Sequence, residues 1–316
     1  MSDVDPLEPA VDPLAPAPDP TLDAGTRRRS ELELRIISAA VLAAAVVILA
    51  YFGGWPYRLM TVLVGMIILQ EWSSMTGSLR PFRLAQGITV VGFAVIALLV
   101  LLAQYMAAIV ATVVAFAFAY AASFWRLRET PRPPDARHWS WLSLGFLYAS
   151  AFMIAFAALR GDTAFGLAAC AFLLATVWAT DTFAYFVGKS LGGPKLAPRI
   201  SPNKTWSGFV GGVVFAVLAG WGVVAIYAAI GTLPGVGFWF VPVAMVLSVV
   251  SQCGDLFESW VKRRSGAKDS GRLIPGHGGL MDRIDGLGAA AVAAVILLVL
   301  ATGGADTDDA LFLTLR

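Results

Sequence analysis

The chain has 316 residues, of which 58% are hydrophobic and 14% are charged, and its formal net charge is +2. Soluble proteins carry about 25% charged residues, so this composition excludes an ordinary soluble domain. Several apolar stretches approach about 20 residues, the length at which a helix crosses the hydrocarbon core of a bilayer. Together these features predict an all-α polytopic membrane protein.

Residues 1–30 differ from the rest of the chain because they are rich in proline and aspartate and have no apolar face. A segment of this composition cannot bury enough apolar surface to fold. It also lacks the basic start and apolar middle of a signal peptide. We therefore expect a disordered cytoplasmic tail.

Nine apolar windows follow, and each predicts a membrane-spanning helix. The stretch 87–125 contains no charge, and a single helix of about 38 residues would exceed a bilayer. A hairpin near Gln104 is therefore expected. The predicted spans are 36–53, 57–75, 84–102, 105–124, 141–159, 164–187, 209–231, 236–254 and 286–303.

The distribution of basic residues predicts how these spans are oriented. With the N-terminus in the cytoplasm and nine crossings, 20 of the 23 lysines and arginines fall on the inner side, and only Arg58, Arg160 and Arg316 fall outside. Cytoplasmic loops normally carry this excess, so the C-terminus is expected outside. The expected regions are the tail 1–30, N-terminal spans over 31–160, C-terminal spans over 161–304 with cytoplasmic loops 188–208 and 255–285, and an outer tail over 305–316.

Two carboxylates fall inside predicted spans, near their cytoplasmic ends. Asp181 lies about two turns before the inner end of its helix, and an intramembrane carboxylate usually marks a functional site. The alternative for Asp181 is an aspartate paired with another helix near the interface. For Glu71, a functional role and a structural pairing with a basic residue across the bundle carry equal weight.

The loop 188–208 ends in SPNKTWSG. Ser201 and Pro202 have the residue types of a helix N-cap followed by a first-turn proline, which predicts that Asn203, Lys204 and Thr205 occupy the first turn. A helix N-terminus with a lysine and hydroxyl groups suits phosphate. The alternative is an ordinary basic loop; no GxxxxGK[ST] motif is present.

The loop 255–285 reads DLFESWVKRRSGAKDSGRLIPGHGGLMDRID and divides into three parts. The first part continues the eighth span as a helix on which Asp255, Ser259 and Lys262 share a face. A glycine-rich segment then allows the backbone to approach a ligand closely. Finally, Asp282 and Asp285 lie on one face in the first turn of the ninth helix.

Carboxylates in this setting favour a hard cation, Mg²⁺ above all. Neighbouring basic residues would hold phosphate charge. The pattern therefore predicts metal-assisted phosphoryl or nucleotidyl transfer at the cytoplasmic interface. The alternative is a solvated loop of mixed charge that only binds anionic headgroups.

The segment SWVKRRSGAKDSGRLIPGHGGLMDRID at 259–285 resembles the signature of the phosphatidate cytidylyltransferase (CDP-diacylglycerol synthase) family. It has that signature's Ser, Lys-Arg, Lys-Asp, Pro-x-His-Gly-Gly and Asp-Arg-x-Asp at their fixed spacing. GDLFES and the stretch 181–212 also resemble the family, so the likeness covers about residues 170–300. It implies an inner-membrane enzyme of phospholipid biosynthesis that converts CTP and phosphatidic acid to CDP-diacylglycerol and pyrophosphate with Mg²⁺, on the cytoplasmic side.

The resemblance also implies roles for individual residues. Asp255 and Asp282 are the first candidates for metal ligands and Asp285 the next, while Asp181 joins or organises the acidic cluster. Lysines and arginines near them are candidate phosphate binders, and hydroxyl, amide and glycine positions are candidates for holding the nucleotide. The first group is Lys204, Lys262, Arg263, Lys268 and Arg283, with Lys262 and Lys268 also counted as catalytic; the second is Ser201, Asn203, Thr205, Ser259, His277, Gly278 and Gly279.

Two positions depart from the family pattern. Ser207 stands where the family commonly has Glu, and Gly286 stands where it commonly has Ser. Either that Glu is not a metal ligand or the site of this chain is altered.

The sequence also bears on several other functions. A CDP-alcohol phosphotransferase would need a DG-x₂-AR pattern, which is absent. A transporter with an ion site at Asp181 would favour internal repeats and midplane charges, and neither is seen. A transferase acting on another lipid phosphate and a non-catalytic binder of anionic lipid both stay open, as do a second cation and a homodimer. No nucleic-acid partner is expected.

Overall fold

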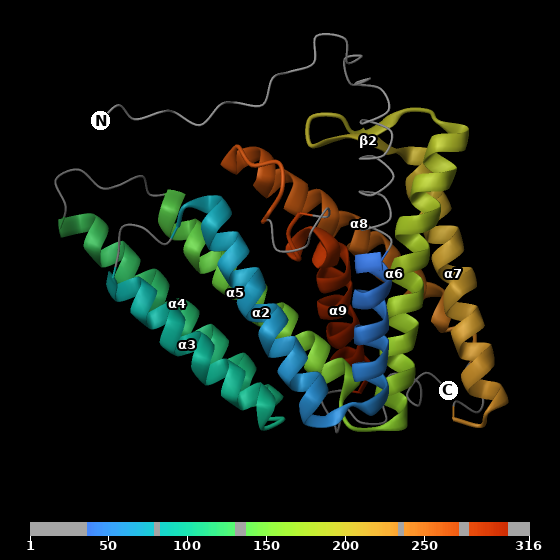
Figure 1. Cartoon of the computed structure of the whole chain (residues 1–316), viewed down its shortest axis with the longest axis horizontal. Helices are drawn as coiled ribbons and strands as arrows, with labels where there is room; N and C mark the ends of the chain where they lie inside the picture. Colours follow the sequence, from blue (N-terminus) through green and yellow to red (C-terminus); the bar gives the residue numbers. More distant parts are fainter. Residues whose placement is uncertain (1–36, 79–82, 130–136, 233–236, 272–277, 303–316) are drawn as a thin grey trace, which may run out of the picture.

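The computed structural model describes residues 37–78, 83–129, 137–232, 237–271 and 278–302, which form a bundle of long helices (Figure 1). The predicted tails 1–30 and 305–316 lie outside these residues. A first helix covers Ile37–Phe52. The elements that follow are α2 Gly54–Thr76, α3 Arg83–Leu101, α4 Tyr105–Glu129, α5 Arg137–Arg160, α6 Ala164–Leu191, β1 Lys195–Ala197, β2 Ser201–Thr205, α7 Trp206–Ala229, α8 Phe240–Ser265 and α9 Met281–Thr302.

Each segment predicted to span the membrane contains an apolar helix. Six of them are long and apolar enough to cross a bilayer: α2, residues 141–160 of α5, α6, α7, α8, and residues 281–301 of α9. The apolar parts of the other three are shorter: Ile37–Phe52, Gln86–Leu101 and Tyr105–Ala121. An α-helical polytopic membrane protein is therefore supported, whereas nine crossings and the side of each terminus stay predictions.

The hairpin expected near Gln104 is confirmed. Helix α3 ends at Leu101 and α4 begins at Tyr105. Between them Ala103 adopts a left-handed conformation with φ of 57°, which the amide of Gln104 supports by donating to the carbonyl of Leu99 at 2.8 Å. The helical continuation of the eighth span is also confirmed, because α8 extends to Ser265.

The predicted helix start at Ser201 is wrong, and the fold is not purely helical. Residues 201–205 form β2, which pairs antiparallel with β1. Pro202 is tolerated there because an edge strand of a small sheet leaves amide positions unpaired. The N-cap lies four residues later, where Thr205 Oγ1 accepts a hydrogen bond from the amide of Gly208 at 3.2 Å.

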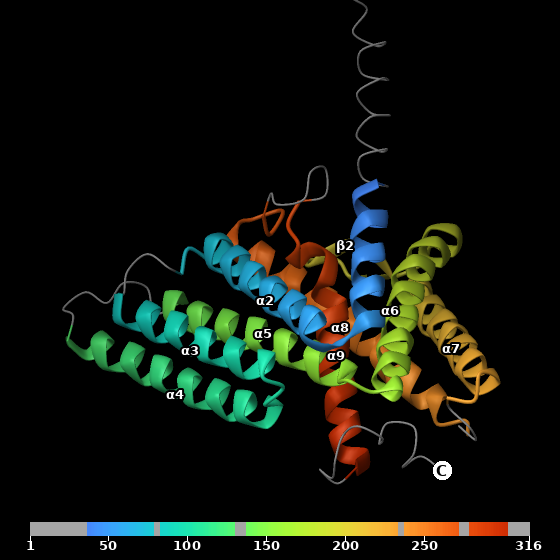
Figure 2. The same ribbon diagram turned by 60° about the horizontal axis from the view of Figure 1, so that its bottom comes forward.

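The helices form two groups around α5 and α9. The α3–α4 hairpin lies at one side and packs on α5, while α6 and α7 pack closely together at the other side (Figures 1 and 2). Helix α9 runs through the centre and contacts α8, α5 and α6. The turn between α5 and α6 and the β1–β2 hairpin lie at opposite ends of the bundle (Figure 1).

An aromatic cluster joins α2, α5 and α8 near the end of the bundle that carries the β1–β2 hairpin. The indole of Trp72 on α2 lies 5.4 Å from the ring of Tyr148 on α5 and 6.2 Å from that of Phe257 on α8, between centroids. Its Nε1 donates to the carbonyl of Trp141 at 2.7 Å. Tilted and offset aromatic pairs of this kind add to the stabilisation from burial alone, so α2 is anchored to both α5 and α8.

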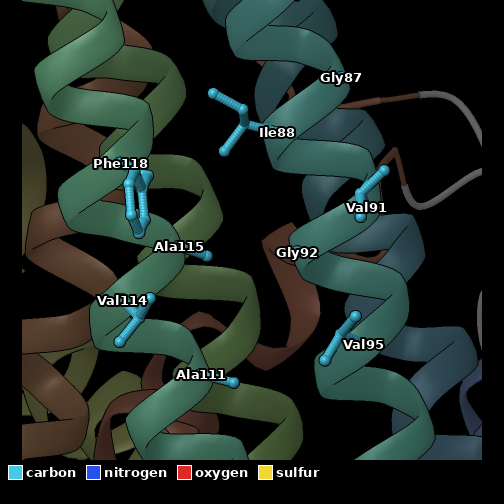
Figure 3. A pocket seen from close by; sticks show the side chains of 9 residues that line it. All are labelled: Gly87, Ile88, Val91, Gly92, Val95, Ala111, Val114, Ala115 and Phe118. Atoms are coloured by element: carbon cyan, nitrogen blue, oxygen red, sulfur yellow. The ribbon is translucent and has the colours of Figure 1, made fainter.

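An apolar groove of about 570 Å³ lies between α3 and α4 (Figure 3). Ile88, Val91 and Val95 line it from α3, and Val114 and Phe118 line it from α4. The lining is almost entirely hydrocarbon and includes no charged side chain. Such a surface suits contact with lipid tails, and no residue of the predicted site takes part in it.

Glycines allow α6 and α7 to approach closely, as is common between membrane helices. A Cβ atom at Gly208 would lie 2.6 Å from the carbonyl oxygen of Ala184 and 3.2 Å from the Cα of Gly188. A Cβ at Gly211 would lie 2.7 Å from Val187. In contrast, Gly222 on the same helix faces open space.

We predict that Gly208→Ala destabilises the protein by about 1–3 kcal/mol, because the overlap is with backbone and the helices must separate. Gly222→Ala is the matched control and should leave the unfolding temperature unchanged or slightly higher. Thermal unfolding of the two variants in the same detergent checks this. Equal unfolding temperatures would show that α6 and α7 are not packed as closely as described.

Candidate active site

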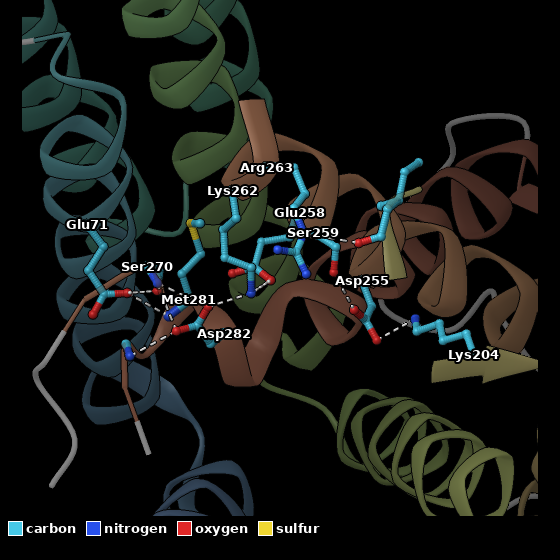
Figure 4. Close-up of polar contacts among 12 residues, drawn as sticks. Glu71, Lys204, Asp255, Glu258, Ser259, Lys262, Arg263, Ser270, Met281 and Asp282 are labelled. Atoms are coloured by element: carbon cyan, nitrogen blue, oxygen red, sulfur yellow. Dashed lines mark hydrogen bonds and ion pairs between the residues drawn. The ribbon is translucent and has the colours of Figure 1, made fainter. Parts of the chain in front are cut away.

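Charged and polar residues from β2, α8, the loop after α8 and α9 converge near the end of the bundle that carries the β1–β2 hairpin (Figure 4). Lys204 comes from β2; Asp255, Glu258 and Lys262 come from α8. Asp282 begins the first turn of α9. The loop after α8 supplies Ser270 and Gly279, which bind the start of α9.

The first group of contacts is centred on Asp255. Its Oδ2 lies 2.5 Å from Lys204 Nζ, and its Oδ1 accepts a hydrogen bond from Ser259 at 3.4 Å. Asp181 on α6 is exposed and within electrostatic range of both Asp255 and Lys204. Asp285 on α9 is within electrostatic range of Asp255 and Asp181. Carboxylates from three helices, α6, α8 and α9, therefore lie within electrostatic range of one another, and Asp255 pairs with Lys204.

The second group is centred on Asp282. Its Oδ1 lies 2.8 Å from Lys262 Nζ, and the backbone amides of Ser270 and Gly279 each donate to Oδ2 at 3.0 Å. Ser270 also approaches Oδ1 at 3.2 Å. Only 9% of the Asp282 side chain is exposed, against 38% for Asp255. Asp255 is thus accessible to a ligand, while Asp282 holds the loop to the start of α9.

Glu258 belongs to the site although the sequence interpretation did not single it out. Lys262 Nζ lies 2.8 Å from its Oε2, one turn away on α8. The side chain is buried, and within the described residues its Oε1 has no hydrogen-bond partner. Its position four residues before Lys262 is the sequence signal that points to this pair.

Glu71 has partners of an unexpected kind. The sequence predicts either a functional role or a pairing with a basic residue, but its contacts among the described residues are neutral donors from the loop before α9 and from the start of that helix. It accepts hydrogen bonds from Ser270 Oγ at 3.0 Å, from the amide of Leu280 at 2.9 Å and from that of Met281 at 2.8 Å. The carboxylate of α2 therefore caps the first turn of α9.

The remaining predicted residues lie around these two groups. Arg263 donates through Nε to the carbonyl of Ile200 at 3.4 Å and so connects α8 to the β1–β2 hairpin. Gly278 has a φ of 87°, and a Cβ there would lie 3.1 Å from Asp282 Oδ2, so glycine is needed in this turn. Ser201 and Asn203 lie on β2, Thr205 caps α7, and Lys268 and Arg283 are exposed near the site, while His277 falls outside the described residues.

Both departures from the expected pattern have a local explanation. Ser207 Oγ donates to the carbonyl of Gly192 and lies 3.0 Å from Thr205 Oγ1, so it ties the end of α6 to the start of α7. At Gly286 a Cβ would lie 2.7 Å from Ser251 Oγ. A hydroxyl on α8 thus occupies the space beside residue 286, where the expected pattern places a serine on α9.

Comparison with known proteins agrees with this arrangement. The sequence pattern of the cytidylyltransferase family matches residues 33–301. A protein of Brucella abortus named phosphatidate cytidylyltransferase is 41% identical over 263 residues, which cover 83% of this chain and 91% of that protein. A protein of the same name from Haemophilus influenzae is 34% identical over 82% of this chain and 96% of its own length. The chain therefore belongs to the cytidylyltransferase family.

Proposed function

We propose that this protein is a phosphatidate cytidylyltransferase, which makes CDP-diacylglycerol and pyrophosphate from CTP and phosphatidic acid. A phosphate oxygen of the lipid bonds to the α-phosphorus of CTP. The bond from that phosphorus to the oxygen bridging the β-phosphate breaks, and its electron pair leaves with pyrophosphate. The observation that carries the proposal is the family match over residues 33–301, which contain every charged residue of the described site.

The side chains of the site suit this reaction without a strong base. The lipid phosphate is already ionised, so positioning and neutralisation of phosphate charge supply most of the rate enhancement. Lys204 is only partly buried, next to the accessible Asp255, and is placed to receive a phosphate. Lys262 lies between Glu258 and Asp282, where it offsets the negative charge of these two carboxylates.

The carboxylates suit a magnesium ion brought in with CTP. Within the described ranges no three Asp, Glu, His or Cys side chains are grouped to hold a metal by themselves. Mg²⁺ commonly takes one or two carboxylates and completes its shell with water and substrate phosphates. The more exposed Asp255 fits this role better than Asp282, whose oxygens already accept bonds from three donors. Asp285 is a further candidate because it lies within electrostatic range of Asp255. When bound, the ion would neutralise triphosphate charge.

The active site faces the cytoplasm of a cell whose inner membrane holds the protein. This orientation is supported by the 20 basic residues that nine crossings place on one side. It is also supported by chemistry, because CTP is a cytoplasmic nucleotide and phosphatidic acid keeps its phosphate at the membrane surface. The charged residues of the site lie toward the end of the bundle that carries the β1–β2 hairpin (Figures 1 and 4).

The activity is tested with purified protein in detergent, phosphatidic acid, Mg²⁺ and CTP labelled at either the α- or the γ-phosphate. We expect label from the α-phosphate to enter the lipid phase and label from the γ-phosphate to appear in pyrophosphate. Omitting Mg²⁺ or adding a chelator should abolish both. If no α-label enters lipid with any divalent metal, the proposed function is wrong.

Removing the central ion pair should abolish turnover while the fold survives. We expect Asp255→Asn and Lys204→Met each to lower kcat about 100-fold or more, since charge stabilisation of this kind typically supplies that factor. Asp162→Asn is the control, because Asp162 also forms an exposed ion pair, with Arg58. Unchanged kcat in the first two variants would remove this pair from the active site.

The orientation is tested by labelling single cysteines in a background in which Cys170 and Cys253 are serine. In intact bacterial spheroplasts, a membrane-impermeant maleimide should label Asp162→Cys and should label Lys268→Cys only after permeabilisation. Both positions are exposed or flank an exposed turn. The reverse labelling pattern would place the active site on the outer side.

A further inference from the structure

We propose that Glu71 is a positioning residue for this reaction: from α2 it holds the glycine-rich loop and the start of α9 in place, so that the carboxylates of α9 face α8. The inference rests on the proposed function. Among the described residues Glu71 contacts Ser270, Leu280 and Met281 and neither Asp255 nor Lys204, so it acts through other residues and does not touch the reacting groups.

Glu71 caps the start of α9. Helix α9 begins at Met281, and the first amides of a helix have no partner within it. Leu280 precedes the helix and has no side-chain acceptor to offer. Glu71 supplies both acceptors, at 2.9 Å for Leu280 and 2.8 Å for Met281. A carboxylate there is also favoured by the positive end of the helix dipole.

The loop between α8 and α9 is shaped around the carboxylate of Glu71. A Cβ at Gly271 would lie 2.7 Å from Glu71 Oε1, and a Cβ at Gly279 would lie 2.7 Å from Oε2. These two glycines let the backbone close over a buried protein carboxylate. That is a different use of glycine from the close approach to a ligand that the sequence suggested.

A continuous chain of polar contacts runs from Glu71 on α2 to the site (Figure 4). Ser270 donates through its hydroxyl to Glu71 and through its amide to Asp282. Asp282 in turn binds Lys262, which also binds Glu258. Next to Glu71, the Trp72 cluster fixes α2 against α5 and α8. A displaced Glu71 would therefore shift Ser270 and Asp282 together.

The test is Glu71→Gln in the full-length protein, with Ser73→Ala as the matched control. Glutamine keeps the size of the side chain but exchanges one acceptor for a donor that faces amide hydrogens. Ser73 lies two residues further along α2 and is also buried, and its hydroxyl has no partner among the described residues. Activity is normalised to folded protein and measured well below the unfolding temperature.

We expect Glu71→Gln to lower kcat about 10- to 100-fold, because small misplacements of positioned groups cost that much, and to raise the Mg²⁺ concentration for half-maximal rate. Ser73→Ala should change neither. Glu71→Asp, which keeps the charge with a shorter reach, should recover part of kcat. Ser270→Ala should lower kcat alone but add little to Glu71→Gln, since contacts acting as one unit are not additive.

Other outcomes separate the inference from the proposed function. If Glu71→Gln unfolds at a lower temperature but keeps the wild-type kcat and Mg²⁺ dependence, Glu71 is only a structural contact and the inference is overturned. If the double variant loses the product of the two single losses, the route through Ser270 is overturned. If the wild-type protein itself transfers no label, it is the proposed function that fails.

Discussion

Asp282 joins the helix that enters the site to the helix that leaves it, because its carboxylate accepts bonds from Lys262 on α8 and from amides on both sides of the intervening loop. A carboxylate near the end of an apolar bundle is costly unless donors compensate it. That constraint accounts for the concentration of lysines, glycines and free amides in one segment of a chain otherwise poor in charge. Lys262 meets the same constraint from the other side, since it serves two carboxylates.

The acidic residues consequently divide into two kinds. Glu71 and Asp282 are mostly buried, and protein donors occupy their oxygens. Asp255 is more exposed, and its one charged partner among the described contacts is Lys204, which a phosphate could draw away. The held carboxylates keep the loop and α9 in place, and the more exposed Asp255 is the one that we propose for metal and nucleotide. Stability and catalysis are thus assigned to different members of one cluster.

The membrane sets the geometry around this cluster. Helices in lipid gain little from burying apolar side chains against one another, so close approach through glycine and a few polar contacts hold them together. Gly208 against Ala184 joins α7 to α6, and Gly286 beside Ser251 joins α9 to α8. The helices that carry Asp181, Asp255 and Asp285 are in this way brought together at one end, where a lipid phosphate and a soluble nucleotide can meet.

Periodicity and local chemistry were enough to predict the apolar helices, the hairpin near Gln104, the helical extension of α8 and the charged segment that carries the site, because each depends on neighbours in the chain. Local rules failed at Ser201, where pairing with β1 outweighs the N-cap residue types and moves the cap to Thr205. They selected Glu71 but could not identify its partners, because its donors lie about 200 residues away. Spacing could show that Asp282 and Asp285 share a face, but only the packed structure shows that loop amides occupy Asp282 and that Asp285 lies within electrostatic range of Asp255 and Asp181. Which carboxylate is held and which is accessible depends on donors supplied by other helices, and a one-dimensional pattern does not contain them.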